Sequence, residues 1–168
     1  MDTKGTQFVK LDCLIHNATV VTQDEDLGAF SCGMVGVAGD RIVLVAEGGE
    51  LPDAIEIVDA RGGMLIPGLI NAHTHLPMTL FRGLADDLPL DVWLNAHIFP
   101  AEARFITPAN VRTGTLLACA ELLLGGVTTC CDGYFLETEV AAAVAQSGMR
   151  AVLAQGVIDF PAPGVADP

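Results

Sequence analysis

One stretch of this sequence, residues 64–75, limits what the chain can fold into more than any other. An apolar run, Met-Leu-Ile-Pro-Gly-Leu-Ile-Asn-Ala, ends in His73-Thr74-His75. In a β-strand, side chains two residues apart point to the same face, so both imidazoles project from one side. Neutral imidazole is the commonest protein ligand for zinc and also suits iron. The stretch therefore predicts a buried strand that ends in two metal ligands, His73 and His75.

The two histidines also have a simpler interpretation, as polar residues that end a strand, because a His-x-His spacing arises by chance. The surrounding residues favour the metal site. Gly62-Gly63 precedes the strand, Pro67-Gly68 lies inside it, and a Leu-Pro-Met segment follows it. A motif in its expected strand-end setting is a stronger indication than the spacing alone.

The wider sequence resembles a known family. Residues 67–75, Pro-Gly-Leu-Ile-Asn-Ala-His-Thr-His, are similar to the first barrel strand of the amidohydrolase superfamily. Residues 77–90 resemble the methylthioadenosine/S-adenosylhomocysteine deaminase branch, whose neighbours include triazine chlorohydrolases and guanine deaminases. The resemblance covers nearly the whole chain. It implies a metal-dependent hydrolase on a (β/α)8 barrel that acts on an aminopurine nucleoside.

Helices and strands alternate in the C-terminal part of the sequence. Thr107-Pro108 is typical of a helix start, and Gly125-Gly126 of a helix end. A short buried strand at 127–131, an alanine-rich helix at 137–147 and a third strand at 150–157 follow. This order predicts a parallel sheet with right-handed crossovers.

Residues 76–105 are expected to form a long loop, because Pro77, Pro89 and Pro100 interrupt short apolar pieces. One helical turn is predicted near residues 91–96. Loops of this length in a compact domain are usually functional or disordered. In a barrel, a loop that follows the C-terminal end of a strand borders the active site.

The N-terminal part of the sequence predicts a small antiparallel β unit over residues 8–61. Residues 10–22 are rich in β-branched side chains and suggest a strand broken near His16-Asn17. Gly39-Asp40 between two apolar runs is a hairpin signal, and residues 55–59 alternate as a further strand. In the amidohydrolases such a unit belongs to a β-sandwich that strands from the far C-terminus complete.

The expected fold class is therefore α/β, in two parts. Residues 1–61 are assigned to the N-terminal part of a composite, antiparallel β-sandwich. Residues 62–168 are assigned to the first βα units, about three strands, of an incomplete TIM-like (β/α)8 barrel. A closed barrel needs roughly 250 residues, or about 200 at the least, whereas the chain has 168. We expect the N-terminal portion of a longer protein, with its catalytic residues and remaining metal ligands beyond residue 168.

Charge and cysteine content exclude several classes of protein. The net charge is −13, with 8 basic and 21 acidic residues, which argues against binding to nucleic acid or to anionic membranes. The five cysteines include no Cys-x-x-Cys pair, so reduced thiols are expected rather than disulfides. Residues 1–7 do not resemble a signal peptide, and no apolar stretch is long enough to span a bilayer. The expected location is the cytoplasm.

Two residues of the long loop are candidates for substrate binding. Trp93, the only tryptophan, is equally well interpreted as the wall of a purine pocket or as a plug that holds the loop down. The resemblance favours the pocket. Glu102 has a simple interpretation as a surface partner of Arg104. In the deaminase branch, however, a glutamate at the matching position accepts hydrogen bonds from the ribose hydroxyls, a task that suits a carboxylate.

Three further residues lie in or near the predicted site. His97, also on the loop, is a conceivable third metal ligand but is better explained as a histidine with a local hydrogen bond. Asp132, at a strand end, has no evident partner and is assigned a structural role. Gln155 stands where some family members carry an arginine that meets the homocysteine carboxylate. That departure favours methylthioadenosine or adenosine over S-adenosylhomocysteine.

The leading hypothesis is the N-terminal portion of a cytosolic, metal-dependent deaminase of aminopurine nucleosides that releases ammonia. The metal is expected to be zinc, with iron as the alternative, and the partner a small-molecule nucleoside. A homo-oligomer of the full-length protein is compatible with the sequence. One rival is another amidohydrolase, similar to the triazine chlorohydrolases or the guanine and cytosine deaminases. The second rival is a truncated chain without catalytic activity.

Overall fold

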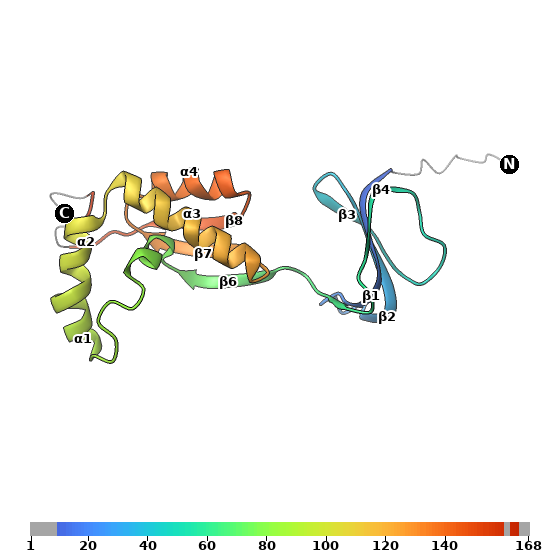
Figure 1. Cartoon of the computed structure of the whole chain (residues 1–168), viewed down its shortest axis with the longest axis horizontal. Helices are drawn as coiled ribbons and strands as arrows, with labels where there is room; N and C mark the ends of the chain where they lie inside the picture. The colour runs from blue at the N-terminus through green and yellow to red at the C-terminus, as the bar shows by residue number, and fades with distance from the viewer. Residues whose placement is uncertain (1–9, 160–161, 165–168) are drawn as a thin grey trace. The chain divides into compact units, whose positions relative to one another are not determined.

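The computed structural model describes residues 10–159 and 162–164, and it divides the chain between Pro67 and Gly68 into two compact units (Figure 1). The first unit contains strands β1 to β5. The second contains strands β6 to β8 and every helix of the described residues. None of the helices within that part of the chain is long and apolar enough to cross a membrane.

The first unit is a five-stranded mixed sheet with the order β3-β2-β1-β4, in which β5 also pairs with β1. β2 is antiparallel to both β1 and β3, whereas β4 and β5 run parallel to β1. Its apolar core consists of two small clusters, one around Leu14 and Met34 and one around Val20 and Val35. The strands are β1 (Leu11–Val21), β2 (Ala29–Ala38), β3 (Arg41–Glu47), β4 (Ala54–Asp59) and β5 (Met64–Leu65).

The local predictions for this unit are confirmed, but the predicted antiparallel arrangement is wrong. Gly39 takes the positive φ of 59° that the hairpin turn requires, and β1 is irregular at Asn17, where φ is 55°. The error concerns β4, because alternation of apolar side chains reports which face is buried and not which way a strand runs. Residues 48–53 return the chain to the far side of β1, so β4 pairs with it in parallel. The second layer of a sandwich stays a prediction.

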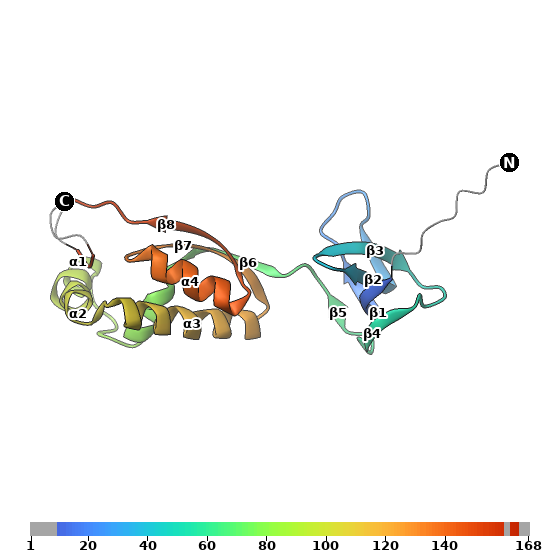
Figure 2. The ribbon, with the colours of Figure 1, turned by 90° about the horizontal axis from the view of Figure 1, so that it is seen from above.

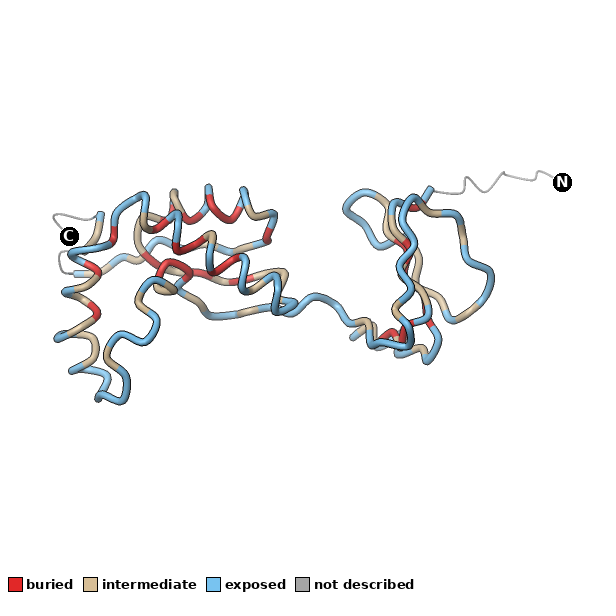
Figure 3. Tube along the Cα trace, viewed as in Figure 1, coloured by how far each residue is buried: buried red, intermediate tan, exposed pale blue. Residues whose placement is uncertain are grey.

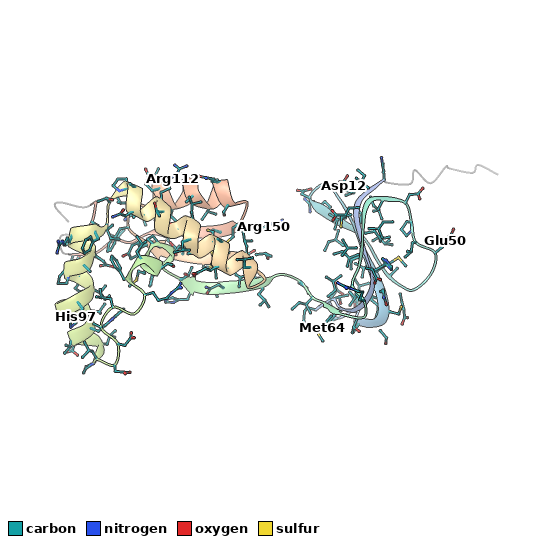
Figure 4. The ribbon with its side chains drawn as sticks, viewed as in Figure 1. Asp12, Glu50, Met64, His97, Arg112 and Arg150 are labelled. Atoms are coloured by element: carbon teal, nitrogen blue, oxygen red, sulfur yellow. The ribbon has the colours of Figure 1, made fainter. Side chains whose placement is uncertain are left out.

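The second unit has a three-stranded parallel sheet with the order β6-β7-β8, as the sequence predicts. Helices α3 and α4 cover one face of this sheet (Figure 2), and Arg112 of α3 donates a hydrogen bond to Gln146 of α4 (Figure 4). The buried residues gather between these helices and the sheet (Figure 3). Closure into a barrel stays a prediction. The elements are β6 (Leu69–Thr74), α3 (Pro108–Leu124), β7 (Val127–Tyr134), α4 (Glu137–Ser147) and β8 (Arg150–Gln155).

The segment between β6 and α3 is more helical than predicted. A 3-10 helix, η1 (Leu76–Phe81), follows β6. The sequence predicted one helical turn near residues 91–96, but the helical segment there is much longer. There α1 (Leu90–Trp93), the π turn η2 (Leu94–Ile98) and α2 (Phe99–Phe105) follow one another without a break. Pro100 misled the sequence reading. It lies directly after the π turn, and the wider turn lets the helical segment continue through the proline.

Close packing of η1 against α3 positions the segment that follows His75. Gly114 of α3 is fully enclosed, and a Cβ there would lie 2.8 Å from the carbonyl oxygen of Pro77 and 2.9 Å from Leu80. Thr107 caps the same helix, because its hydroxyl accepts the N–H of Asn110 at 3.2 Å. The absence of a side chain at Gly114 thus allows the backbone of η1, which follows His75, to pack directly against α3.

Candidate active site

His73 and His75 lie together at the C-terminal end of β6. Their ring centroids are 5.1 Å apart, with the ring planes at 77°. The two-residue period of the strand places both rings on one side of the sheet. Together with Cys131 and Asp132 of β7 they line a cavity of about 250 Å³. Two imidazoles at this separation suit two ligands of one metal ion.

A backbone contact fixes the orientation of the His75 ring. Its Nδ1 lies 2.5 Å from the carbonyl oxygen of Gly133 on β7. A carbonyl only accepts hydrogen bonds, so Nδ1 carries the proton and Nε2 keeps a free lone pair. This is the usual outer-shell arrangement around a histidine that binds a metal. His75 is therefore prepared to bind through Nε2.

Asp132 has the partner that the sequence did not reveal. Its Oδ1 accepts the N–H of Leu76 at 2.6 Å and so ties β7 to the residue after His75. Burial raises the pKa of Asp132, and burial together with the charge of Asp132 raises the pKa of Glu137. Two buried carboxyl groups this close favour a state in which one of them is protonated. Asp132 thus holds the backbone that follows β6 by a hydrogen bond from β7.

A second cavity, of about 260 Å³, contains three of the four residues that the sequence singled out. His75, Trp93 and Glu102 all line it, although they come from separate elements. Its other walls are largely apolar, and the one further polar side chain among the lining residues is Tyr134. The complete lining is His75, Met78, Trp93, Leu94, Ile98, Phe99, Glu102, Gly133, Tyr134, Phe135, Gly156 and Ile158.

The π turn explains why Trp93 and Glu102 face the same cavity. Nine residues of regular α-helix turn through 900°, which would place these side chains on opposite sides. In η2 the N–H of Phe99 donates to the carbonyl of Leu94, five residues back. That wider turn puts Trp93 in line with Ile98, and the α-helical spacing of four then puts Ile98 in line with Glu102. The three side chains form one stripe along the cavity wall.

Glu102 is buried and hydrogen-bonded, so its interpretation as a surface partner of Arg104 is wrong. The side chain is part of a residue that is only 5% exposed, and its Oε1 accepts the hydroxyl of Tyr134 at 2.6 Å. Arg104 instead lies over the ring of Phe105. Burial raises the pKa of Glu102, while the hydrogen bond from Tyr134 and the charge of His75 lower it in part. From the sequence alone, a glutamate in this segment is expected at the surface. Tyr134, which is 32 residues away, provides the hydrogen bond that allows Glu102 to be buried.

Tyr134 is the site residue that the sequence analysis missed. The strand before it was expected to end at Cys131, but β7 continues to Tyr134. Cys130, Asp132 and Tyr134 alternate along β7 as buried residues. Extending the period-two pattern beyond Cys131 would have pointed to Tyr134, although not to its partner.

Trp93 both lines the cavity and fastens the preceding loop. Its indole Nε1–H donates to the carbonyl oxygen of Leu84 at 3.2 Å. The loop between η1 and α1 holds Ala85 and Asp87 at positive φ, a conformation that needs support from its surroundings. The two interpretations of Trp93, a pocket wall and a plug, are thus compatible in the structure.

The remaining candidates do not join these two cavities. His97 lines a separate cavity of about 660 Å³ with Arg82 and Phe105, and it projects from the helical segment (Figure 4). Gln155 accepts the N–H of Glu137 through its Oε1 at 3.2 Å and thereby caps α4. Within residues 10–159 and 162–164, no group of three His, Cys, Asp or Glu side chains is arranged to hold a metal ion.

Comparison with known proteins gives the site a context. A 5-methylthioadenosine/S-adenosylhomocysteine deaminase of Syntrophus aciditrophicus is 44% identical over 94% of this chain, which covers 36% of that protein. A 5′-deoxyadenosine deaminase of Methanococcoides burtonii is 45% identical over 89% of the chain, which covers 34% of that protein. The chain thus spans about a third of the length of these curated relatives.

Solved structures agree with the sequence relatives. An adenosine deaminase from Xanthomonas campestris, crystallised with bound zinc, superposes with a TM-score of 0.89 at 41% identity. The match covers 94% of this chain and 37% of the deaminase. The profile of the amidohydrolase family matches residues 64–167, a segment that includes β6 and the two histidines at its end. The chain therefore belongs to the amidohydrolase family.

Proposed function

We propose that this chain is the N-terminal part of a metal-dependent deaminase that removes ammonia from aminopurine nucleosides. One observation carries the proposal: His75, Trp93 and Glu102 line a single cavity. A metal ligand, an aromatic surface and an acceptor of hydroxyl hydrogen bonds are the three groups that such a substrate requires. The names of the relatives at 44% and 45% identity support the same reaction.

His73 and His75 are the residues that would hold the metal. Their exposed rings and the free Nε2 of His75 fit a divalent ion that takes further ligands from elsewhere in the protein. When bound, such an ion supplies an activated nucleophile at neutral pH by lowering the pKa of water. Zinc is the favoured metal, with iron as the alternative, because the Xanthomonas deaminase was crystallised with zinc.

Trp93 and Glu102 would bind the two halves of the nucleoside. The indole offers a flat apolar face for a purine base. The Glu102 carboxylate offers acceptors for the paired ribose hydroxyls, and a free base lacks those donors. Placing both on one helical stripe gives the cavity an apolar wall with one charged group at a defined position.

The surroundings of Gln155 favour a nucleoside with an uncharged 5′ substituent. The Gln155 amide oxygen already accepts the N–H of Glu137, and its amide nitrogen donates to the carbonyl of Gly156 at 3.3 Å. The side chain therefore offers at most one further N–H, and no charge, to a homocysteine carboxylate. Methylthioadenosine, 5′-deoxyadenosine and adenosine are preferred over S-adenosylhomocysteine.

Other parts of the proposal concern the whole protein. Residues 1–61 would contribute to a composite β-sandwich, and residues 62–168 the first βα units of a TIM-like barrel. The net charge of −13 supports a protein that binds neither nucleic acid nor anionic membranes, and the proposed location is the cytoplasm. A homo-oligomer is compatible with this arrangement.

The test uses a protein of the relatives' full length that carries residues 1–168, called here the full-length deaminase. Loaded with zinc, it should release ammonia from methylthioadenosine, 5′-deoxyadenosine or adenosine, and lose this activity when a chelator removes the metal. Ammonia is measured in a coupled assay across a panel that includes guanine, cytosine and a chlorotriazine. Activity confined to a free base or to the triazine would reject the nucleoside assignment in favour of the rival amidohydrolases.

A further inference from the structure

We propose that Tyr134 is a positioning residue that fixes the Glu102 carboxylate for ribose recognition, and that it thereby sets the preference for nucleosides over free bases. The inference rests on the proposed function and adds to it a residue that makes the binding selective. Tyr134 acts through Glu102 and does not itself bind the substrate.

Tyr134 contacts Glu102 directly. The Tyr134 hydroxyl donates to Oε1 of Glu102 at 2.6 Å, and both residues are more than nine-tenths buried. The terminal torsion of a glutamate is broad, so a lone carboxylate samples many orientations. One short hydrogen bond selects a narrow range of them. The remaining lone pairs of the carboxylate are then available to the cavity that both residues line.

The Tyr134 hydroxyl is held in place independently of any ligand. Burial and the neighbouring Glu102 raise the pKa of Tyr134, so the phenol keeps its proton and always donates. Its ring packs against Phe135 at a centroid distance of 4.9 Å and lies 6.0 Å from the ring of His75. Tyr134 also belongs to the main apolar cluster of the second unit. The position of its hydroxyl therefore does not depend on whether a ligand is bound.

Neighbouring residues of β7 position both halves of the site. The carbonyl of Gly133 fixes the ring of His75, and the hydroxyl of Tyr134 fixes the carboxylate of Glu102. The His75 ring and the Glu102 carboxylate are consequently held by two adjacent residues of one strand. Loss of the Tyr134 hydroxyl would free the Glu102 carboxylate and leave the contact between Gly133 and His75 intact.

The experiment combines three variants of the full-length deaminase: Tyr134→Phe, Glu102→Ala and the double variant. Inosine and hypoxanthine serve as competitive inhibitors, because they differ by the ribose alone. Tyr134→Phe should weaken inosine inhibition about five- to tenfold while leaving hypoxanthine inhibition and kcat nearly unchanged. In the Glu102→Ala background, Tyr134→Phe should produce no further loss. Thr115→Val is the matched control, since it removes another buried hydroxyl and should leave both inhibition constants unchanged.

Four results would overturn the inference. Multiplying effects in the double variant would show that Tyr134 contacts the substrate by itself. Equal weakening of inosine and hypoxanthine, with a lowered melting temperature, would show a merely structural role. A wild-type protein that neither binds nor deaminates nucleosides would reject the proposed function and this inference with it. An active wild type with an unaffected Tyr134→Phe variant would reject the inference alone.

Discussion

The two cavities at the C-terminal ends of β6 and β7 differ in how much of each this chain supplies. The cavity around His73 and His75 has exposed imidazoles and, in the described residues, no third metal ligand beside them. The cavity around Glu102 has a buried carboxylate that already holds its hydrogen-bond donor, and largely apolar walls. Residues from a third of the relatives' length thus complete the hydrogen-bonded surroundings of Glu102, whereas the described residues bring only two histidines together at the other cavity.

The strongest test of this contrast uses residues 1–168 alone. Zinc should bind weakly, because two histidines supply two ligands where a catalytic site has three protein ligands and a water. Ammonia release from adenosine should not exceed that of a His73→Ala, His75→Ala variant of the same chain. Zinc affinity is measured by competition with a chromophoric chelator. Stoichiometric tight binding together with turnover would break the comparison, since the reactive centre would then be complete within this chain.

A smaller effect is expected on the nucleoside side. Glu102→Ala in the full-length deaminase should raise KM for adenosine roughly tenfold to a hundredfold, the equivalent of about 1.5–3 kcal/mol for a charge-assisted hydrogen bond. Inhibition by hypoxanthine should change little, because the base has no ribose to lose. Glu50→Ala, on an exposed loop of the first unit (Figure 4), is the control. Equal losses for both ligands would contradict a ribose contact.

The smallest effect concerns the carboxyl pair that supports the metal side. Burial and the charge of Asp132 raise the pKa of Glu137 to about 7, so ionised Glu137 destabilises the fold at higher pH. Glu137→Gln is always neutral and should raise the melting temperature by about 2–4 °C at pH 8. The gain should shrink as the pH falls below 7 and vanish near pH 4, where the wild-type carboxyl is protonated in both states. A gain that does not depend on pH would argue against a buried charge at Glu137.

The sequence predicted the second unit well because its signals are local. Thr107 and the glycines after α3 and α4 mark helix ends, and the apolar runs between them become β7 and β8 in the expected parallel order. The placement of the His73 and His75 rings on one side of the sheet follows from strand periodicity. Trp93 and Glu102 were found through the family resemblance, since nothing in their immediate neighbourhood distinguishes them from surface residues.

The features that the sequence did not reveal depend on contacts between distant segments. The direction of β4 is decided by which edge of β1 is free, and alternation along β4 is the same for either direction. The bond between Tyr134 and Glu102 joins positions 32 residues apart. Pro100 argued for a loop, although the π turn before it allows the helical segment to continue through residue 105.

That π turn has a consequence for how such a pocket diversifies. A π turn is an α-helix that holds one additional residue per turn, so deleting any one residue of Leu94–Ile98 would restore the regular helix. After such a deletion Trp93 and Glu102 would be eight residues apart, a spacing that regular α-helix turns through about 800°, so the indole would still lie on the same side as Glu102. A regular helix that kept all nine residues would instead rotate Trp93 by about 100° relative to Glu102 and carry the indole away from the cavity. The aromatic wall of the pocket thus depends on how many residues separate the two side chains as well as on which residues they are.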